Sequence, residues 1–226
     1  MGQSFTAPVP GRSAVLALLP ALLALGLAWG CRSSGARPAP AGVAGLIEGP
    51  TRWLMLPEEE REVRRLRTTR EVIDFIEAFW RRRDPDPLTP DNELSKVFYE
   101  RVEAADRLYS EEGQRGSLTD RGRALVLLGP PPVLRYNQKR VPILESSLPG
   151  QVLAPAQSRT LSLETWVYPT DGLPPRFLDL LRESLGEDPP PAEVVLTFSV
   201  GSRKTALNDG EKYLALAARA SVREPR

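Results

Sequence analysis

The stretch that decides the fold class runs from residue 68 to residue 109 and reads TTREVIDFIEAFWRRRDPDPLTPDNELSKVFYERVEAADRLY. A Thr-x-x-Glu capping box starts at Thr68, and apolar residues then recur at helical spacing, which predicts a helix over 68–83. Asp84-Pro85-Asp86-Pro87 ends this helix, because a residue that precedes proline avoids the α region. Thr89-Pro90 predicts the start of another helix. Its apolar stripe consists of Leu94, Val97, Phe98, Val102, Ala105, Leu108 and Tyr109.

Outward from this stretch, the pattern changes from helices to strands. On the N-terminal side, Pro57 predicts the start of a short charged helix that ends near Arg67. On the C-terminal side, apolar runs and alternation predict strands over 124–128, 161–168 and 193–200, a helix over 173–186, and a hairpin partner, EKYLALA, after the Asn208-Asp209-Gly210 turn. Residues 133–160 lack periodicity and are interpreted as a long excursion. The order indicates an α+β fold, with an N-terminal helical layer packed on a small, mostly antiparallel C-terminal sheet.

The composition excludes several kinds of chemistry. The 226 residues include no histidine, which excludes imidazole-based triads and histidine-ligated metals. A single cysteine excludes internal disulfides and dithiol redox sites. With 30 basic and 29 acidic residues, the chain is nearly neutral, which argues against nucleic acid as a partner.

The single cysteine lies at the end of an N-terminal apolar run. Residues 14–28 read AVLALLPALLALGLA, and Cys31 follows shortly after. The run is too short for a comfortable membrane span and fits the apolar region of a signal peptide. This segment resembles a bacterial lipoprotein signal, so residues 1–30 are predicted to be a signal peptide and Cys31 the lipidation site. The alternative is an uncleaved anchor helix with a chance cysteine.

Composition divides the rest of the chain into three parts. Residues 31–52 are rich in Gly, Ala, Pro and Ser and are predicted to be a flexible tether. A single α+β domain is predicted over 53–217, with order beginning near Trp53. Residues 218–226 are predicted to be a C-terminal tail.

Two segments together carry a resemblance to a known family. They are FIEAFWRRRDPDPLTPDNEL, residues 75–94, and FYERVEAADRLYSEEGQRGSLTDRGRALVLLGPPPVLRY, residues 98–136. Both resemble the bacterial GWxTD domain, whose naming motif corresponds here to Gly116-Ser117-Leu118-Thr119-Asp120, so that Ser117 replaces the motif tryptophan. Glu164-Thr165-Trp166-Val167-Tyr168 is similar to the family's E-x-W-x-Y strand. The resemblance covers about 53–217 and implies an exported or lipid-anchored protein, but it brings no established catalytic residues.

The candidate site residues come from these motifs. They are Gly116, Thr119, Asp120, Arg121, Arg123, Trp166 and Tyr168, interpreted as a structural or binding motif. Trp166 and Tyr168 share the less apolar face of their strand, which makes them candidates for an exposed binding surface unless the helical layer covers them. A buried pair between Asp120 and an arginine of the Arg-Arg-Arg-Asp-Pro run, which would join helix to sheet, is a further hypothesis.

Other clusters have competing interpretations. Asp84, Asp86 and Asp91 could bind Ca²⁺, but the pattern favours capping of the adjacent helix. Arg81-Arg82-Arg83 with Arg121 and Arg123 could form a basic patch, although a solvated helix end is favoured. Thr119-Asp120 could supply a nucleophile and a base, but neither histidine nor a nearby lysine supports that interpretation. No catalytic residue, metal site or cofactor is predicted.

These patterns favour a non-catalytic interaction or scaffolding module in the cell envelope. The predicted anchor is a lipidated Cys31 in the inner or outer membrane, with the domain in the periplasm and an envelope protein as partner. Two alternatives stay open. One is an envelope hydrolase that uses carboxylates on peptidoglycan or polysaccharide, and the other is a small-ligand binder that uses the Trp166/Tyr168 face.

Overall fold

The computed structural model describes residues 40, 42–142, 158–186, 188–201 and 203–223. The predicted signal peptide, Cys31 and most of the tether lie outside these residues. No helix within the described ranges is long and apolar enough to cross a membrane.

Helices precede a sheet, as the sequence predicts. The α-helices are α1 (Val43–Glu48), α2 (Pro57–Val63), α3 (Thr69–Arg81), α4 (Glu93–Leu108), α5 (Asp120–Leu128), α6 (Pro175–Leu185) and α7 (Glu211–Ala220). Short 3₁₀ helices are η1 (Pro50–Leu54), η2 (Gly116–Leu118) and η3 (Thr170–Gly172). The strands are β1 (Val133–Pro142), β2 (Ser158–Pro169), β3 (Glu193–Val200) and β4 (Thr205–Asp209). The α+β class is confirmed.

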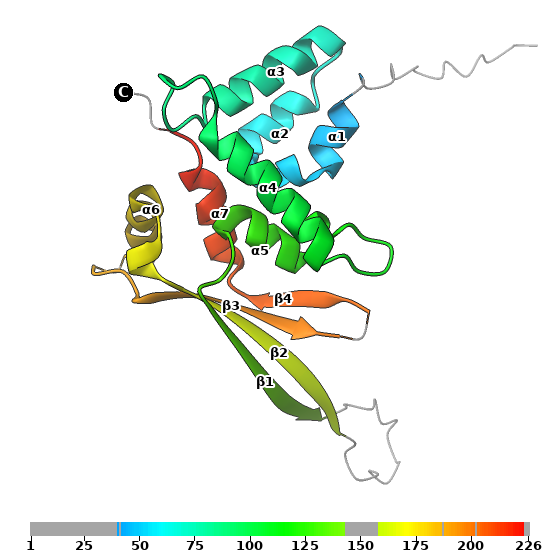
Figure 1. Cartoon of the computed structure of the whole chain (residues 1–226), viewed down its shortest axis with the longest axis vertical. Coiled ribbons are helices and arrows are strands. Elements are labelled where there is room, and N and C mark those ends of the chain that lie inside the picture. Colours follow the sequence, from blue (N-terminus) through cyan, green and yellow to red (C-terminus); the bar gives the residue numbers. More distant parts are fainter. Residues whose placement is uncertain (1–39, 41, 143–157, 187, 202, 224–226) are drawn as a thin grey trace, which may run out of the picture. The chain divides into compact units, whose positions relative to one another are not determined.

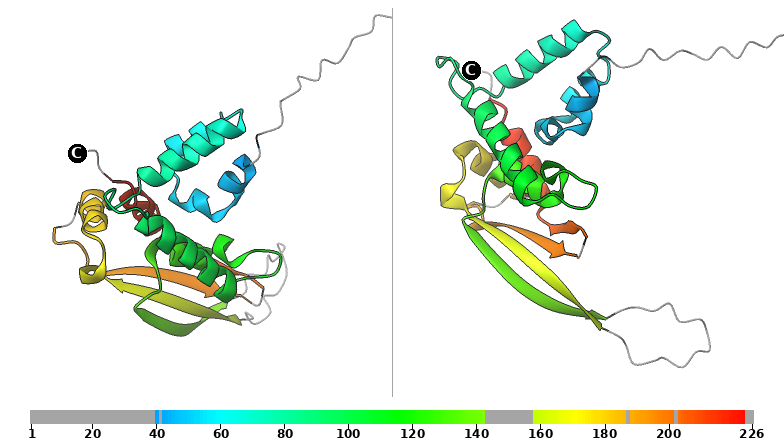
Figure 2. Two further views of the ribbon diagram at one scale, coloured as in Figure 1. Left: turned by 45° about the horizontal axis from the view of Figure 1, so that its top comes forward. Right: turned by 45° about the vertical axis from the view of Figure 1, so that its right-hand side comes forward.

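The sheet has the strand order β1-β2-β3-β4, and all neighbouring strands are antiparallel. The pairing of β1 with β2 begins at Val133 opposite Val167 and runs to Pro142 opposite Ser158, whereas β3 pairs with β2 only from Ser162 onward. The β1–β2 ribbon therefore extends past the end of β3, which can be followed in Figure 2.

The core lies between one face of the sheet and the helices α4, α5 and α7, which Figure 1 shows on the same side of the strands. Trp166 of β2 is completely buried there, with its ring 5.6 Å from Tyr109 at the end of α4 and 5.1 Å from Phe198 of β3. Val194, Leu196 and Phe198, which alternate along β3, are each fully buried. Burial of these apolar and aromatic side chains is the main stabilising contribution to the fold.

The strand predicted over 124–128 is wrong, because these residues form the second half of helix α5. A short, continuous apolar run does not distinguish a buried strand from a buried helix. The residues before it decide the outcome. Thr119 caps the helix by accepting a hydrogen bond from the Gly122 N–H (3.1 Å), and Asp120 lies in the first turn, where an acidic group is favoured.

The predicted hairpin partner is also wrong. Residues 211–217 belong to helix α7, and the partner of β3 is β4, which already includes Asn208 and Asp209. Gly210 has φ +107°, so the chain turns there from the strand into the helix. The region 133–160, interpreted as an excursion, contains β1 and the start of β2. The described side chains of β1 are exposed on both faces, so the strand carries no apolar alternation.

Two predicted boundaries need correction. Helix α1 and η1 lie within or across the end of the predicted tether 31–52, and Val43, Leu46 and Leu54 are buried, so order begins before Trp53. At the other end, α7 continues into the predicted tail, where the Arg223 N–H donates to the Arg82 carbonyl (2.9 Å). Helix α4 begins at Glu93 rather than at Thr89, because the Asn92 side chain caps it by accepting from the Ser95 N–H (2.8 Å).

Candidate functional site

The glycines of the motif allow two backbones to approach each other. A Cβ atom on Gly116 would lie 1.9 Å from the Ala105 carbonyl oxygen of α4, and one on Gly122 would lie 1.7 Å from the Gly116 carbonyl oxygen. Both distances are far inside van der Waals contact and involve main-chain atoms, which cannot move like a side chain. Only glycine therefore lets η2 and α5 pack this closely against α4 and against each other.

Thr119 fixes the start of α5. Its side chain is 2% exposed and accepts from the Gly122 N–H, while its hydroxyl donates to the Gly116 carbonyl (2.8 Å). These contacts satisfy a backbone donor at the helix start and hold the preceding 3₁₀ turn. The threonine is committed to a cap, and it is not positioned as a nucleophile.

Asp120 binds the sheet rather than an arginine. Its Oδ2 accepts from the Leu207 N–H of β4 at 2.7 Å, and Glu111 Oε1 accepts from the Thr205 N–H of the same strand at 3.0 Å. Leu207 and Thr205 are two residues apart, so their N–H groups lie on the same side of β4, away from β3. The hypothesis of a buried pair between Asp120 and an arginine of the Arg-Arg-Arg-Asp-Pro run is wrong, because Arg82 and Arg83 pair with Glu59; Asp120 joins helix to sheet through the backbone of β4 instead.

Arg121 connects the motif with β2. Its guanidinium lies 3.2 Å from Glu164 Oε2 and 3.5 Å from Glu111 Oε1, and it stacks over the Tyr109 ring at 4.9 Å. The other oxygen of Glu164 accepts from the Trp166 indole N–H at 2.6 Å. Partial burial and the nearby Glu164 carboxylate raise the pKa of Tyr109, although Arg121 opposes this. The arginine, two glutamates, tyrosine and tryptophan form one buried polar network between helices and sheet.

The prediction of an exposed Trp166/Tyr168 surface is wrong, because Trp166 is 0% and Tyr168 2% exposed. The helical layer covers the face of β2 that carries Trp166 and Tyr168. The opposite face, which carries Leu161 and Leu163, is more exposed although its residues are less polar. The Tyr168 hydroxyl donates to the Gly129 carbonyl (2.9 Å), and burial raises the pKa of this phenol. Polar partners explain how such residues occupy the core face.

Arg123 lies at the edge of this region. It forms an ion pair with Glu211 of α7 (2.7 Å), and its guanidinium lies 4.8 Å from the centre of the Trp53 ring. Arg123 thus links α5 to the start of α7 and to η1.

Ser117, which replaces the motif tryptophan, is completely buried. Its N–H donates to Asp106 Oδ1 (2.8 Å), and its carbonyl accepts from the Trp53 indole N–H (2.9 Å). Partial burial alone would raise the pKa of Asp106, but hydrogen bonds from Ser117 and the charge of Arg115 lower it overall. The serine position is therefore enclosed, with the tryptophan of η1 hydrogen-bonded to its backbone.

The Arg-Arg-Arg-Asp-Pro run contributes to a buried ion pair that the sequence pattern does not predict. The fully buried Arg83 side chain makes a bidentate pair with Glu59 of α2, with N–O distances of 2.9 and 2.6 Å, and Arg82 adds a contact of 2.9 Å to the same carboxylate. Arg83 also donates to the Leu54 carbonyl (2.6 Å). Burial raises the pKa of Glu59, but the hydrogen bonds from Arg83, the Leu56 N–H and Arg82 outweigh it and lower the pKa.

Neither interpretation of the arginines as a basic patch or a solvated helix end therefore describes Arg83. The arginines at 82, 83, 121 and 123 are all paired with carboxylates. The sequence signal for an inward-facing Glu59 is its position as the third residue of α2. A carboxylate at this position folds back and accepts from the backbone at the helix start, here from the Leu56 N–H (2.9 Å).

Asp84 and Asp86 form local turns. Asp84 Oδ1 accepts from the Asp86 N–H, and Asp86 Oδ1 accepts from the Leu88 N–H, both at 3.1 Å. The first turn of α4 contains Glu93, and the cap is Asn92, so Asp91 does not fill the capping position predicted for it. Within the described ranges, no group of acidic or cysteine side chains could hold a metal ion.

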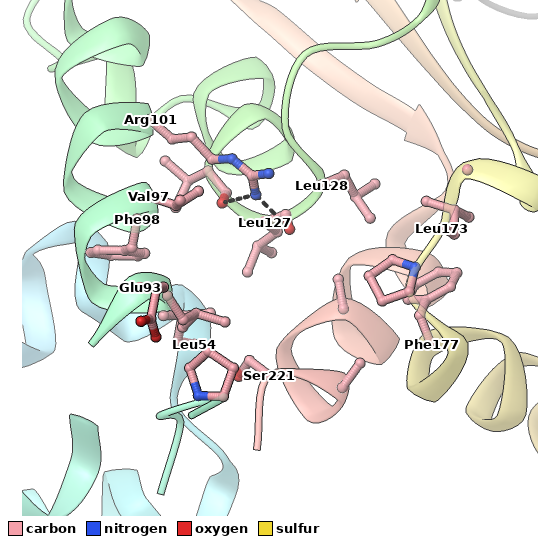
Figure 3. A pocket seen from close by; sticks show the side chains of 17 residues that line it. Leu54, Glu93, Val97, Phe98, Arg101, Leu127, Leu128, Leu173, Phe177 and Ser221 are labelled. Atoms are coloured by element: carbon pink, nitrogen blue, oxygen red, sulfur yellow. Dashed lines mark hydrogen bonds between the residues drawn. The ribbon is translucent and has the colours of Figure 1, made fainter. Parts of the chain in front are cut away.

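A cavity of about 490 Å³ lies between α4, α5, α6 and α7, and Figure 3 shows the side chains around it. Its walls are mostly apolar and include Phe98, Leu127 and Phe177. Arg101 enters from α4 and donates to the carbonyls of Val126 (3.3 Å) and Leu127 (3.4 Å) at the end of α5. Nothing in the sequence pattern singles out Arg101, because its surroundings depend on α5 being a helix.

Comparison with known families agrees with the motifs. Residues 44–145 match the model of the GWxTD domain, and the chain is a GWxTD domain-containing protein. The matched range contains α4, the Gly116–Asp120 motif and β1, but it ends before the Glu164–Tyr168 segment, whose assignment to the family stays a prediction. The comparisons with curated proteins and with solved structures gave no match.

Proposed function

We propose that this GWxTD domain-containing protein is a lipid-anchored protein of the cell envelope, facing the periplasm, that acts as a non-catalytic interaction module. The predicted lipidation of Cys31 supports the location in the cell envelope, and the exposed strand β1 supports the mode of interaction. The site residues of the motif support a structural role, because Thr119, Asp120 and Arg121 are all committed to contacts within the domain.

The observation that carries the proposal is the exposure of β1. Every side chain from Val133 to Arg140 is exposed, and the strand lies at an edge of the sheet, paired among the described residues only with β2. Leu134 is 43% and Tyr136 72% exposed. An exposed edge strand with apolar side chains is a template for another strand, because its outward N–H and C=O groups lack partners.

The charge of β1 defines the partner. The strand contains Arg135, Lys139 and Arg140 but no carboxylate, and Arg135 already forms an ion pair with Glu193 of β3 (3.8 Å), which leaves Lys139 and Arg140 as the cations for a partner. The occupant is therefore an extended, acidic segment of an envelope protein that adds a strand beside β1. Its backbone supplies the hydrogen bonds, and its acidic side chains match the cations.

Crosslinking with a photoreactive residue at position 136, in intact envelopes, tests the proposal. We expect a crosslinked protein that disappears when Leu134→Ser and Lys139→Glu are introduced together. Leu88→Ser is the matched control, because Leu88 is 93% exposed and lies outside the sheet. Equal loss with the control, or an unchanged product with the β1 variant, would contradict binding at β1.

A separate experiment tests the proposed lipid anchor at Cys31. Cys31→Ala should remove the lipid-dependent shift in mobility and move the chain out of the membrane fraction or leave an unprocessed precursor. Unchanged mobility together with unchanged fractionation counts against the lipid anchor.

The hydrolase alternative has no observation in its favour. The cavity lined by Phe98, Leu127 and Phe177 is mainly apolar, and two further cavities among the described residues contain more arginines than carboxylates. A pair of acids placed across a sugar bond is the geometry that such chemistry needs.

A further inference from the structure

The cavity between α4, α5, α6 and α7 has the character of a ligand site. Its volume of about 490 Å³ is within the usual range for small-molecule pockets, and its wall is apolar with few polar groups. Leu127, Phe177 and Ala217 approach it from three different helices, as Figure 3 shows for the first two. Residues from separate elements therefore form one apolar chamber.

Arg101 is the single cation among the described residues that line this cavity. Its guanidinium makes two long hydrogen bonds, to the Val126 and Leu127 carbonyls, and it has no carboxylate within ion-pair distance in the described part of the chain. Partial burial lowers the pKa of this guanidinium. Arg83 and Arg121, by contrast, are both neutralised by glutamates. A partly desolvated cation without a counter-charge is costly, and an anion that binds to it relieves this cost.

The acidic group of the cavity lies at the other end. Glu93 is eight residues before Arg101 on α4, which corresponds to about 12 Å along the helix. Its Oε1 accepts a hydrogen bond from the Thr89 hydroxyl (2.6 Å). The cavity is therefore polarised, with a cation at the end of α5, an acid near the start of α4 and an apolar wall between them.

We propose that this cavity binds a single-chain amphiphile with an anionic head, a carboxylate or a phosphate monoester. The head pairs with the Arg101 guanidinium, whose planar fork matches two oxygens of such a group. The alkyl chain lies along Leu127, Phe98 and Phe177 and is removed from water there. This binding is independent of the interaction proposed at β1, which lies on a different element.

Calorimetric titration of the purified full chain with dodecanoate and dodecyl phosphate below their micellar concentrations, and with dodecanol below its solubility limit, tests the proposal. We expect saturable binding of at least one of the anions, about tenfold or more tighter than that of dodecanol. The anion that binds more tightly identifies the head group. Equal binding of dodecanol, or binding of no anion, overturns the proposal.

Two variants locate the site. Arg101→Gln should weaken binding of the anion by about tenfold while leaving that of dodecanol nearly unchanged, and Val97→Trp should weaken both by filling the cavity from a position that is 40% exposed. Arg107→Gln, on the exposed surface of the same helix, is the control and should bind like the original chain. If Arg101→Gln does not fold, Arg101→Lys replaces it and should still weaken binding of the anion. Unchanged binding in the Val97→Trp variant overturns the location.

Discussion

The two edges of the sheet have opposite surroundings. Along β4, the carboxylates of Asp120 and Glu111 accept the backbone N–H groups of Leu207 and Thr205, so the motif helix and the segment before it close this edge. Along β1, the described side chains are all exposed, and no helix of the described chain covers the strand. The difference separates two roles that the sequence motif alone does not distinguish. The motif stabilises the domain, and the strand opposite to it is available to a partner.

The largest expected effect tests the close packing on which the closed edge depends. In Gly122→Ala, the new Cβ meets the Gly116 carbonyl oxygen, and we expect a loss of more than about 4 kcal/mol in the free energy of unfolding. Gly45→Ala is the control, because nothing lies within 4 Å of the position that its Cβ would take and alanine is the better helix former. Chemical denaturation measures both. A folded Gly122→Ala variant of full stability would mean that η2 and α5 are not in contact.

The next effect is expected at Glu59, a buried carboxylate away from the closed edge. Glu59→Gln leaves Arg83 without a counter-charge, and we expect a loss of about 3 kcal/mol. Asp74→Asn, in an exposed pair with Arg70, should cost less than about 0.5 kcal/mol. Similar losses in both variants would contradict the burial of the Glu59 pair.

The same variant has a pH signature. The pKa of Glu59 is lower in the folded chain than its ordinary value of 4.5. The stabilisation from its ionised form is therefore fully present above about pH 4.5 and is lost as the pH falls through the folded pKa. Denaturation curves of the original chain and of Glu59→Gln should converge as the pH is lowered from about 7 to about 3. A difference that is constant over this range contradicts the lowered pKa.

A smaller effect is expected when the closed edge itself is opened. Asp120→Ala removes the acceptor of the Leu207 N–H, and we expect a loss of about 2 kcal/mol, measured as a lower melting temperature. Glu112→Ala is the control, because Glu112 is an exposed neighbour with only a distant arginine partner. If Asp120→Ala keeps full stability but loses binding to a partner, then Asp120 is a functional rather than a structural residue.

The smallest effect on stability is expected at the open edge. Tyr136→Ser should change the free energy of unfolding by less than about 0.5 kcal/mol, because the side chain is mostly exposed. The same variant should reduce capture of the acidic partner segment. A large loss of stability would place Tyr136 in the core and contradict an open β1.

The sequence predicted those elements whose local signals agree with their surroundings. The capping box at Thr68 and Glu71 is present, and alternation in β3 identified its buried face. Sequence patterns failed where tertiary contacts decide. The run at 124–128 is a helix because of the cap that precedes it, and β1 lacks a pattern because neither of its faces is buried.

The sequence predicted several residues of the candidate site but not the contacts between them. The residues that Arg121 contacts, Glu111 and Glu164, lie far apart in sequence, and no spacing rule links them. Trp166 and Tyr168 were assigned to the wrong face, because a strand with polar partners in the core has the same pattern as a strand that faces solvent. The pair of Glu59 and Arg83 was also missed, because a charged side chain is ordinarily exposed.

Backbone hydrogen exchange, measured residue by residue in the purified chain, tests the central comparison most directly. We expect the Leu207 and Thr205 amides of β4 to exchange slowly, and Asp120→Ala to accelerate exchange of the Leu207 amide selectively. The β1 amides directed away from β2 should exchange quickly. Equal protection of the outward amides on both edges, or a Leu207 amide that is unaffected by Asp120→Ala, would contradict the comparison.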